Sequence, residues 1–260
     1  MQRHLPITML IISMISTSCL SLSAQNEREE TERALSVCFA FFPRAPEWFF
    51  RNSGGDLEKL KSNTSGFHAT NRVPNSSEIT LYREVVDNEG NRSKQPVTTV
   101  DLPDGDAPAR LLYYLDENGK PTPMVFGDSA ETHPEFGVRV LNLLNEPIGV
   151  LLGQLKDGSV ERKPVRAKSG EVFRPVEGAN ELFQFKYFRQ GENGELIPSS
   201  ATNIIYRGPG QRYTVVVGYK PLYRYTEGAD EEMADRSVAG ISTDKIIFLD
   251  QTTPAAAQAR

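Results

Sequence analysis

The sequence has little cysteine, histidine or tryptophan: two, three and one residues in a chain of 260. Cys19 lies in the N-terminal apolar stretch, so removal of that stretch leaves Cys38 alone. One cysteine cannot form an internal disulfide, even in an oxidising compartment. Because Cys38 lies in the apolar run 35–42, we expect a buried side chain rather than a reactive thiol or an intermolecular bridge. Stability must therefore come from packing.

Recognisable catalytic motifs are also missing. The chain has no G-x-S-x-G elbow, no H-E-x-x-H, no P-loop and no G-x-G-x-x-G before a helix. His68 and His133 lie in polar, loop-like stretches without a neighbouring Cys or His, so we expect surface side chains rather than zinc ligands or general bases. A Ser-His-Asp triad assembled in space stays open. The sequence predicts a non-enzymatic protein with no catalytic residue, no cofactor and no bound metal.

An excess of positive charge is lacking too, since 29 Lys and Arg stand against 34 Asp and Glu, for a formal charge of −5. This balance argues against a nucleic-acid partner and against an anionic membrane surface.

Long hydrophobic runs are also lacking. The apolar stretch 5–15 is too short to span a bilayer. With its basic start at Arg3 and the small residues 16–24, it predicts a signal peptide over residues 1–24. We expect a secreted or periplasmic protein that does not span the membrane. An uncleaved anchor, or a lipid anchor through Cys19, is the alternative.

What the sequence does have is a series of short apolar runs between turn residues, with 17 prolines and 20 glycines spread along the chain. Such spacing predicts an all-β protein of the sandwich or barrel type. A short helix is possible at 56–62, and the charged segment 25–33 would form at most one helical turn. The predicted strands are 35–42, 48–50, 79–86, 97–102, 110–115, 123–126, 138–144, 148–152, 159–167, 171–176, 180–189, 202–206, 212–217 and 245–249.

The order of strands and turns repeats after about a hundred residues. The run 180–189 matches 77–86, with Phe185 opposite Tyr82, and 212–217 matches 110–115. This pattern predicts an internal duplication. The alternatives are two unrelated β modules or one large sheet protein.

We therefore expect two tandem immunoglobulin-like β-sandwich domains with an extensive interface. Their predicted limits, with those of the flanking segments, are a charged linker at 25–33, a first domain at 34–130, a second domain at 136–250 and a disordered tail at 251–260.

The segment 136–154 holds two apolar runs around Asn145-Glu146-Pro147. We interpret it as a buried hairpin or corner that opens the second domain. The runs 138–144 and 212–217 are apolar on both faces, which indicates a sheet covered on both sides. The last run, 245–249, is expected to close the second sheet or to reach back to the first domain.

The aromatic group near the end of the second domain is the candidate interaction surface. Tyr219, Tyr223 and Tyr225 alternate with Lys220 and Arg224. Partly exposed amphipathic rings suit a protein interface or a platform on which sugars stack. The alternative is that the rings cap the core of the sandwich. The predicted interaction surface consists of Tyr219, Tyr223, Arg224 and Tyr225.

Two groups of acidic residues remain. Asp101, Asp104 and Asp106 lie in DLPDGDAP, which is either a calcium-binding loop or, as we favour, a turn whose carboxylates accept backbone hydrogen bonds. The acidic run 227–235 is typical of a solvated segment, although paired carboxylates are also what a glycosidase needs.

The sequence as a whole predicts a secreted, non-enzymatic binding or structural protein of the cell envelope or exterior, acting through protein–protein interaction. The partner would be an envelope or extracellular protein, reached through loops, a sheet edge or the acidic segment. The alternative is a carbohydrate-binding module that uses the aromatic residues of the second domain, with a glycan as ligand. A hydrolase would require acids that face one cleft.

Overall fold

The computed structural model describes residues 32–154, 160–173, 181–191, 193–198, 203–207, 211–223 and 238–251. These residues form β-strands and no helix, which confirms the all-β prediction. It follows that none of them belongs to a helix able to cross a membrane.

The first half of the chain contains β1 (Glu32–Phe39), β2 (Trp48–Arg51), β3 (Leu57–Lys59), β4 (Ser62–Asn63), β5 (Thr70–Pro74), β6 (Glu78–Val86), β7 (Arg92–Asp101), β8 (Ala109–Leu115) and β9 (Pro121–Gly127). The second half contains β10 (Val138–Asn142), β11 (Ile148–Gln154), β12 (Val160–Val165), β13 (Ser169–Phe173), β14 (Glu181–Gln190), β15 (Leu196–Pro198), β16 (Asn203–Arg207), β17 (Gln211–Tyr223) and β18 (Val238–Gln251).

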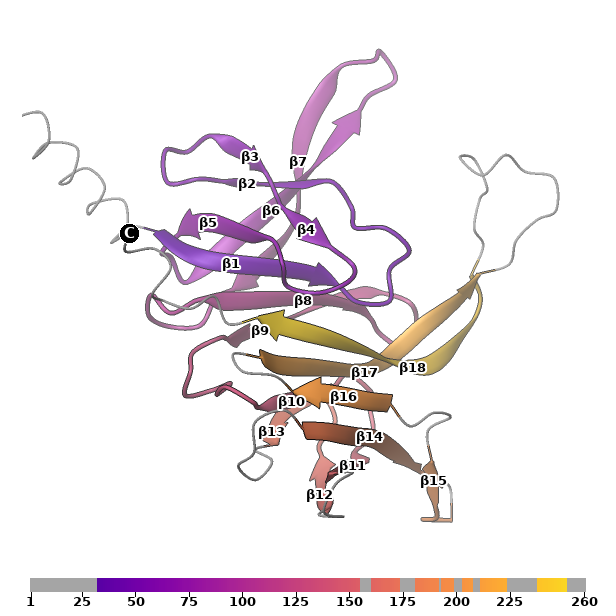
Figure 1. Cartoon of the computed structure of the whole chain (residues 1–260). Helices are drawn as coiled ribbons and strands as arrows, with labels where there is room; N and C mark the ends of the chain where they lie inside the picture. The colour runs from indigo at the N-terminus through magenta and orange to yellow at the C-terminus, as the bar shows by residue number, and fades with distance from the viewer. Residues whose placement is uncertain are drawn as a thin grey trace, which may run out of the picture.

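The strands form three sheets, stacked from top to bottom in Figure 1. A four-stranded sheet, in the order β3-β2-β6-β7, lies at one end, and a five-stranded sheet built on β12-β11-β14-β15 lies at the other. Between them lies a nine-stranded sheet with strands from both halves, which meet where Tyr219 of β17 pairs with Leu115 of β8. The outer sheets thus belong to one half each, and the central sheet belongs to both.

The strand pairing of the first half recurs in the second half. β1 runs parallel to β8, as β10 does to β17. β5 pairs antiparallel with β1 and β9 with β8, as β13 pairs with β10 and β18 with β17. The outer sheets also agree, because β2 lies between β3 and β6 as β11 lies between β12 and β14. The last predicted strand, 245–249, lies in β18, which pairs with β17 of the second half in the nine-stranded sheet.

The structure contains three apolar cores, one in each half and one between the halves. The first-half core includes Phe39, Phe50 and Tyr113, against which Trp48 packs its ring edge-on, and the second-half core includes Val140, Phe185 and Val215. The third core lies between the halves and joins Cys38, Ala40, Phe41, Phe67, Leu112 and Tyr114 of the first half to Leu141, Leu143, Val216 and Phe248 of the second. Cys38 is completely buried there, as predicted.

The third core explains why several strands are apolar on both faces. All seven residues of β8 and all five of β10 are buried, because one face of each strand packs on an outer sheet and the other on the opposite half. This confirms the prediction of a sheet that is covered on both sides.

The segment 136–154 is a corner and not a hairpin. β10 belongs to the central sheet, whereas β11 belongs to the five-stranded sheet and pairs with β12 and β14. The buried Asn142 side chain holds the corner: its amide donates to the carbonyls of Glu146, Val165 and Arg166, and its oxygen accepts from Leu144 N–H. A buried corner needs such partners because its backbone groups leave the sheet ladder.

Three local predictions were wrong. Residues 56–62 contain β3 and β4 instead of a helix, since Leu57–Lys59 pairs with β2. Glu32 and Arg33, placed in the charged linker, belong to β1. Phe185 and Tyr82, which were matched in the predicted repeat, do not occupy equivalent environments. Phe185 is buried in the second-half core. Tyr82, which follows an irregularity in the β6–β7 register, is half-buried outside the first-half core.

Candidate functional site

The most distinctive surface of the described residues is the outer face of the five-stranded sheet. Side chains alternate between the faces of a strand. On β11, Ile148, Val150 and Leu152 point into the core, which leaves Gly149 and Leu151 on the outer face. An outer face that meets water usually carries polar side chains, so an apolar one indicates a surface with a partner.

Two rows of cross-strand neighbours form this face. In the first row, Gly149 lies between Pro164 of β12 and Phe188 of β14; in the second, Leu151 lies between Arg162 and Lys186. Glycine has no side chain, so the first row is a trough with Pro164 and Phe188 as its walls. The resulting groove has a volume of about 470 Å³ and is lined by Gly149, Val150, Leu151, Arg162, Lys163, Pro164, Phe188 and Leu196. We call it the outer groove.

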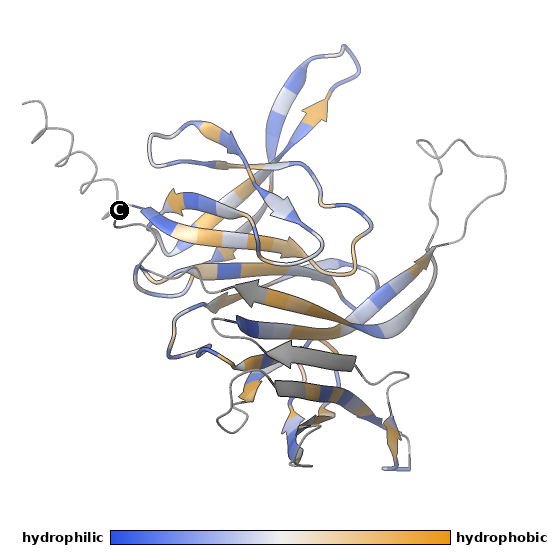
Figure 2. Cartoon of the chain, in the orientation of Figure 1, coloured by the Kyte–Doolittle hydropathy of each residue, from blue (hydrophilic) through white to orange (hydrophobic). Residues whose placement is uncertain are grey.

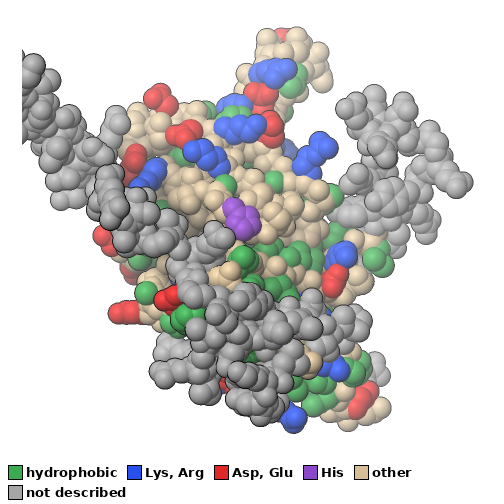
Figure 3. Space-filling view, viewed as in Figure 1, with side chains coloured by type: hydrophobic (Ala, Val, Ile, Leu, Met, Phe, Trp, Pro, Cys, Tyr) green, Lys and Arg blue, Asp and Glu red, His purple; other side chains and the backbone are tan. Residues whose placement is uncertain are grey.

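The strand β15 extends the apolar surface of the outer groove. Leu196 is 66% exposed and Ile197 is 50% exposed, the first and third most exposed of the large apolar side chains described. Figure 2 shows β15 coloured as hydrophobic, and Figure 3 shows green apolar side chains open to solvent at the same end of the molecule. The outer groove therefore continues into an exposed apolar rim.

Two cations of this face, Arg162 in the lining of the outer groove and Lys186 beside it, have no acidic partner among the described residues. Neither Arg162 nor Lys186 forms an ion pair or side-chain hydrogen bond with any residue that the structure describes; the Lys186 ammonium lies 5.5 Å from the centre of the Phe188 ring. Neighbouring cations behave differently, since Lys163 pairs with Glu161 and Arg189 with Glu146. The second row thus carries two positive charges that are available to a ligand.

The matching face of the first half is built differently. There, Lys94 lies 3.3 Å above the centre of the Phe49 ring and itself pairs with Glu84, while Arg51 lies 5.5 Å from the centre of the Tyr82 ring. Thr80 and Thr99 form a hydroxyl pair between them. On this face the aromatic rings are in contact with cations of the same chain, and the hydroxyl groups bond to each other. The face therefore lacks the apolar trough of the second half.

Few features of the sequence indicated the outer groove. Leu151 stood in the run 148–152, which was predicted as part of a buried hairpin or corner, and Phe188 stood in the predicted strand 180–189. The available signal was glycine at 149 and 153, on either side of Leu151. A glycine inside a strand can mark a close approach by another chain.

The predicted aromatic surface is only partly within the described residues. The ring of Tyr219 packs against the second-half core, and its hydroxyl accepts a 3.4 Å hydrogen bond from Asn145 N–H. Tyr223 ends β17, while Arg224 and Tyr225 lie outside the described residues. The structure therefore places Tyr219 at the junction between the halves, and the interaction surface stays a prediction.

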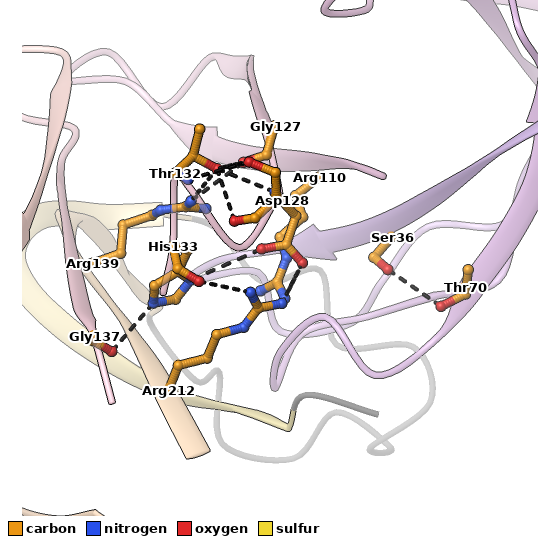
Figure 4. A network of polar contacts seen from close by, with 11 residues as sticks. Ser36, Thr70, Arg110, Gly127, Asp128, Thr132, His133, Gly137, Arg139 and Arg212 are labelled. Carbon is orange, nitrogen blue, oxygen red and sulfur yellow. Dashed lines mark hydrogen bonds and ion pairs between the residues drawn. The ribbon is translucent and has the colours of Figure 1, made fainter. Parts of the chain in front are cut away.

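The expectation for His133 was wrong, whereas His68 is exposed as predicted. His133 is completely buried, and its Nε2 lies 3.3 Å from the Gly137 carbonyl (Figure 4). Burial, and then the positive charges of Arg139, Arg212 and Arg110, lower the pKa of His133 to about 3. A neutral imidazole inside a basic cluster has a structural role, not that of a surface residue.

The same cluster ties the two halves together. Asp128, just after β9, accepts from Arg110 of β8 at 2.6 Å and from Arg212 of β17 at 2.7 Å. Arg212 also donates to the His133 carbonyl, and Arg139 donates to the Gly127 carbonyl. These ion pairs and hydrogen bonds connect β8, β17 and the segment after β9, as Figure 4 shows.

The loop 101–108 surrounds an internal cation, while its aspartates Asp101, Asp104 and Asp106 are exposed. Arg33 donates to the carbonyls of Pro103 and Ala107, at 2.6 and 2.8 Å, from a side chain that is almost completely buried. Burial lowers the pKa of Arg33, and the nearby Asp106 carboxylate opposes this shift. The Arg33 guanidinium thus holds the loop through the carbonyls of Pro103 and Ala107.

No group of three or more potential metal ligands occurs among the described residues, although the acidic run 227–235 lies outside them. No protein-family model matches the chain, and no curated protein resembles it in sequence. The function must therefore be argued from the surface itself.

Proposed function

We propose that this is a secreted, non-catalytic protein of the cell envelope or exterior that acts through protein–protein interaction. The observation that carries the proposal is the outer groove, with its apolar trough and its exposed rim at Leu196. Arg162 in its lining and Lys186 beside it have no acidic partner within the described part of the chain. Exposed apolar surface costs solubility, and patches of this kind mark sites that a partner covers. The predicted signal peptide at residues 1–24 supports a location outside the cytoplasm, and a lipid anchor through Cys19 is the alternative form of that location.

A face, and not a sheet edge, is the better candidate for contact. Several strands at the sheet margins carry prolines, which lack the backbone N–H that another strand would need. The examples are Pro74 in β5, Pro96 in β7, Pro121 and Pro123 in β9, Pro164 in β12 and Pro198 in β15. These residues discourage strand addition and leave the outer face as the site of contact.

We also propose that the two halves are tandem β-sandwich modules that arose by duplication. The repeated pairing of β1 with β8 and of β10 with β17 supports this origin. These parallel pairs depart from the antiparallel sheets of an immunoglobulin domain. The immunoglobulin-like part of the proposal rests on module size and strand number alone.

The test is a pull-down from an envelope extract, with residues 25–260 as bait and mass spectrometry as the readout. The unmodified chain is compared with a double variant, Leu151→Asp with Leu196→Asp. The matched control is Val86→Asp with Val97→Asp, which places the same charges on exposed apolar residues of the first half. We expect one stoichiometric protein that the groove variant loses and the control retains. Capture that is unaffected by the groove variant would overturn the assignment of the site.

The carbohydrate-binding alternative predicts another outcome of the same experiment. It would recover polysaccharide in place of a protein, and binding would depend on the aromatic residues Tyr219, Tyr223 and Tyr225. Because the ring of Tyr219 packs against the core, a sugar would have to stack on the other rings. We therefore rank this function second.

A further inference from the structure

The shape of the outer groove suits one apolar side chain. At Gly149 the trough is open, since a Cβ built there would come no closer than 3.8 Å to another atom, the Cβ of Phe188. Pro164 on one side and Phe188 on the other form apolar walls. A side chain of a partner that fills this space would be removed from water, which contributes roughly 1.5–3 kcal/mol for a residue of leucine size.

The charge of the outer groove lies at a defined distance from the trough. Arg162 and Lys186 flank Leu151, which is two residues along β11 from Gly149. Two residues of an extended strand span roughly 6.6–6.8 Å. An extended peptide that lies along β11 has the same repeat, so its residues i and i+2 would face Gly149 and Leu151 together.

The chemistry of the lining favours a peptide over a sugar. Sugar hydroxyl groups need hydrogen-bonding partners when they are buried, and an unpaired one costs about 1–3 kcal/mol. Leu151, Pro164 and Phe188 offer no side-chain hydrogen bond, and the trough is walled by apolar atoms. A carboxylate, by contrast, would lie between two positively charged side chains in the second row, Arg162 and Lys186.

We infer that the outer groove binds an extended acidic segment of a partner protein, with an apolar residue over Gly149 and a carboxylate two residues away between Arg162 and Lys186. The inference rests on the proposed function and names the partner's chemistry. The recognised pattern is apolar–any–acidic, read along one face of an extended chain. Its charge is opposite to that of the groove, which explains how a protein of net charge −5 attracts an acidic partner at this place.

The experiment selects peptides from a random library displayed on phage, with the mature chain as the target. In this experiment the groove variant is Arg162→Glu with Lys186→Glu, which replaces the Leu151 and Leu196 double variant of the pull-down. The matched control is Arg72→Glu with Arg83→Glu, two exposed cations of the first half. Equal denaturation midpoints establish that all three proteins are folded. A synthetic peptide of the selected sequence then gives dissociation constants by fluorescence anisotropy.

We expect the apolar–any–acidic pattern to be enriched on the mature chain and on the control. The groove variant should bind the peptide at least about tenfold more weakly, and replacing Glu by Lys in the peptide should restore binding to that variant. A peptide with one additional residue between the apolar and acidic positions should bind more weakly, because the two side chains then face opposite sides.

Three results would overturn the inference. The first is a selected pattern without an acid at that spacing, or no selection at all. The second is binding on a glycan array that the groove variant loses. The third is self-association that depends on the groove, measured by sedimentation, which would make a second copy the occupant. If the envelope pull-down still depends on Leu151 and Leu196 in any of these cases, the proposed function stands and only the peptide chemistry fails.

Discussion

Arg110 of β8 and Arg212 of β17 donate to the same carboxylate oxygen, Asp128 Oδ2, at 2.6 and 2.7 Å. Both arginines are at the same place in their halves, at or near the start of the strand that runs parallel to β1 or to β10. One acid in the connection between the halves therefore binds a matching cation from each. The side chains of all three residues are at most 10% exposed.

Asp128→Asn should destabilise the protein by about 3–5 kcal/mol. The substitution leaves two buried guanidinium groups without the carboxylate, and breaking a buried ion pair from one side has this cost. Urea denaturation gives the free energy of unfolding. Asp104→Asn, on an exposed loop residue, is the control and should change it by less than about 0.5 kcal/mol. Equal effects of the two substitutions would show that the cluster does not hold the halves.

His133 should make stability dependent on pH. Its pKa is lowered to about 3 in the folded state, against about 6.5 when unfolded. Between these values the unfolded chain binds a proton that the folded chain does not, so stability decreases as the pH falls through this window. The contribution is at most about 1.4 kcal/mol per pH unit. It is measured as the difference in pH dependence between the unmodified chain and His133→Gln, with the exposed His68→Gln as control. Parallel curves for the unmodified chain and His133→Gln would contradict the prediction.

Val140→Asp should cost more than about 3 kcal/mol, the order of magnitude for burying an unpaired charge. Val140 is completely buried in the second-half core. The denaturation midpoint tests this, and Val86→Asp, at a residue that is 55% exposed, should change it little. A loss below about 1 kcal/mol would mean that β10 is not a core strand.

Gly218→Ala should weaken the packing between the halves. A Cβ at this position would lie 2.8 Å from the ring of Phe41 and 3.4 Å from Leu143 Cδ1, on either side of the interface. Overpacking of this kind costs about 1–3 kcal/mol. Cys38, in the same core, reports the loosening as faster labelling by a thiol reagent in the folded state. Gly127→Ala, which meets no atom within 4 Å, is the control and should leave the labelling rate unchanged.

The sequence predicted those features that depend on local periodicity and turn chemistry. The turns at Gly90 and Gly119 have positive φ, and Asp87 and Asp116 each accept two backbone N–H bonds in these turns. Nearly all of the longer strands were also foreseen, because they are rich in apolar residues. The strand β5 was missed because its residues Thr70, Asn71 and Arg72 are polar, and it is stabilised by pairing with β1.

Features that depend on distant segments were not predictable. His133 looked like a loop residue because two of the three arginines that surround it, Arg110 and Arg212, lie 23 and 79 positions away in sequence. The outer groove was hidden for a related reason. Leu151 belongs to a run that is apolar at every position, and Phe188 directly follows the apolar Tyr187. Only the pairing of β11 with β12 and β14 decides which of these side chains face outward.

The core between the halves fixes how far apart the two outer sheets are. That spacing depends on packed side chains such as Phe67, Leu112 and Phe248, and not on the length of the connecting segment. A cut in the backbone between Asp128 and Phe136 would therefore yield one particle on a sizing column instead of two.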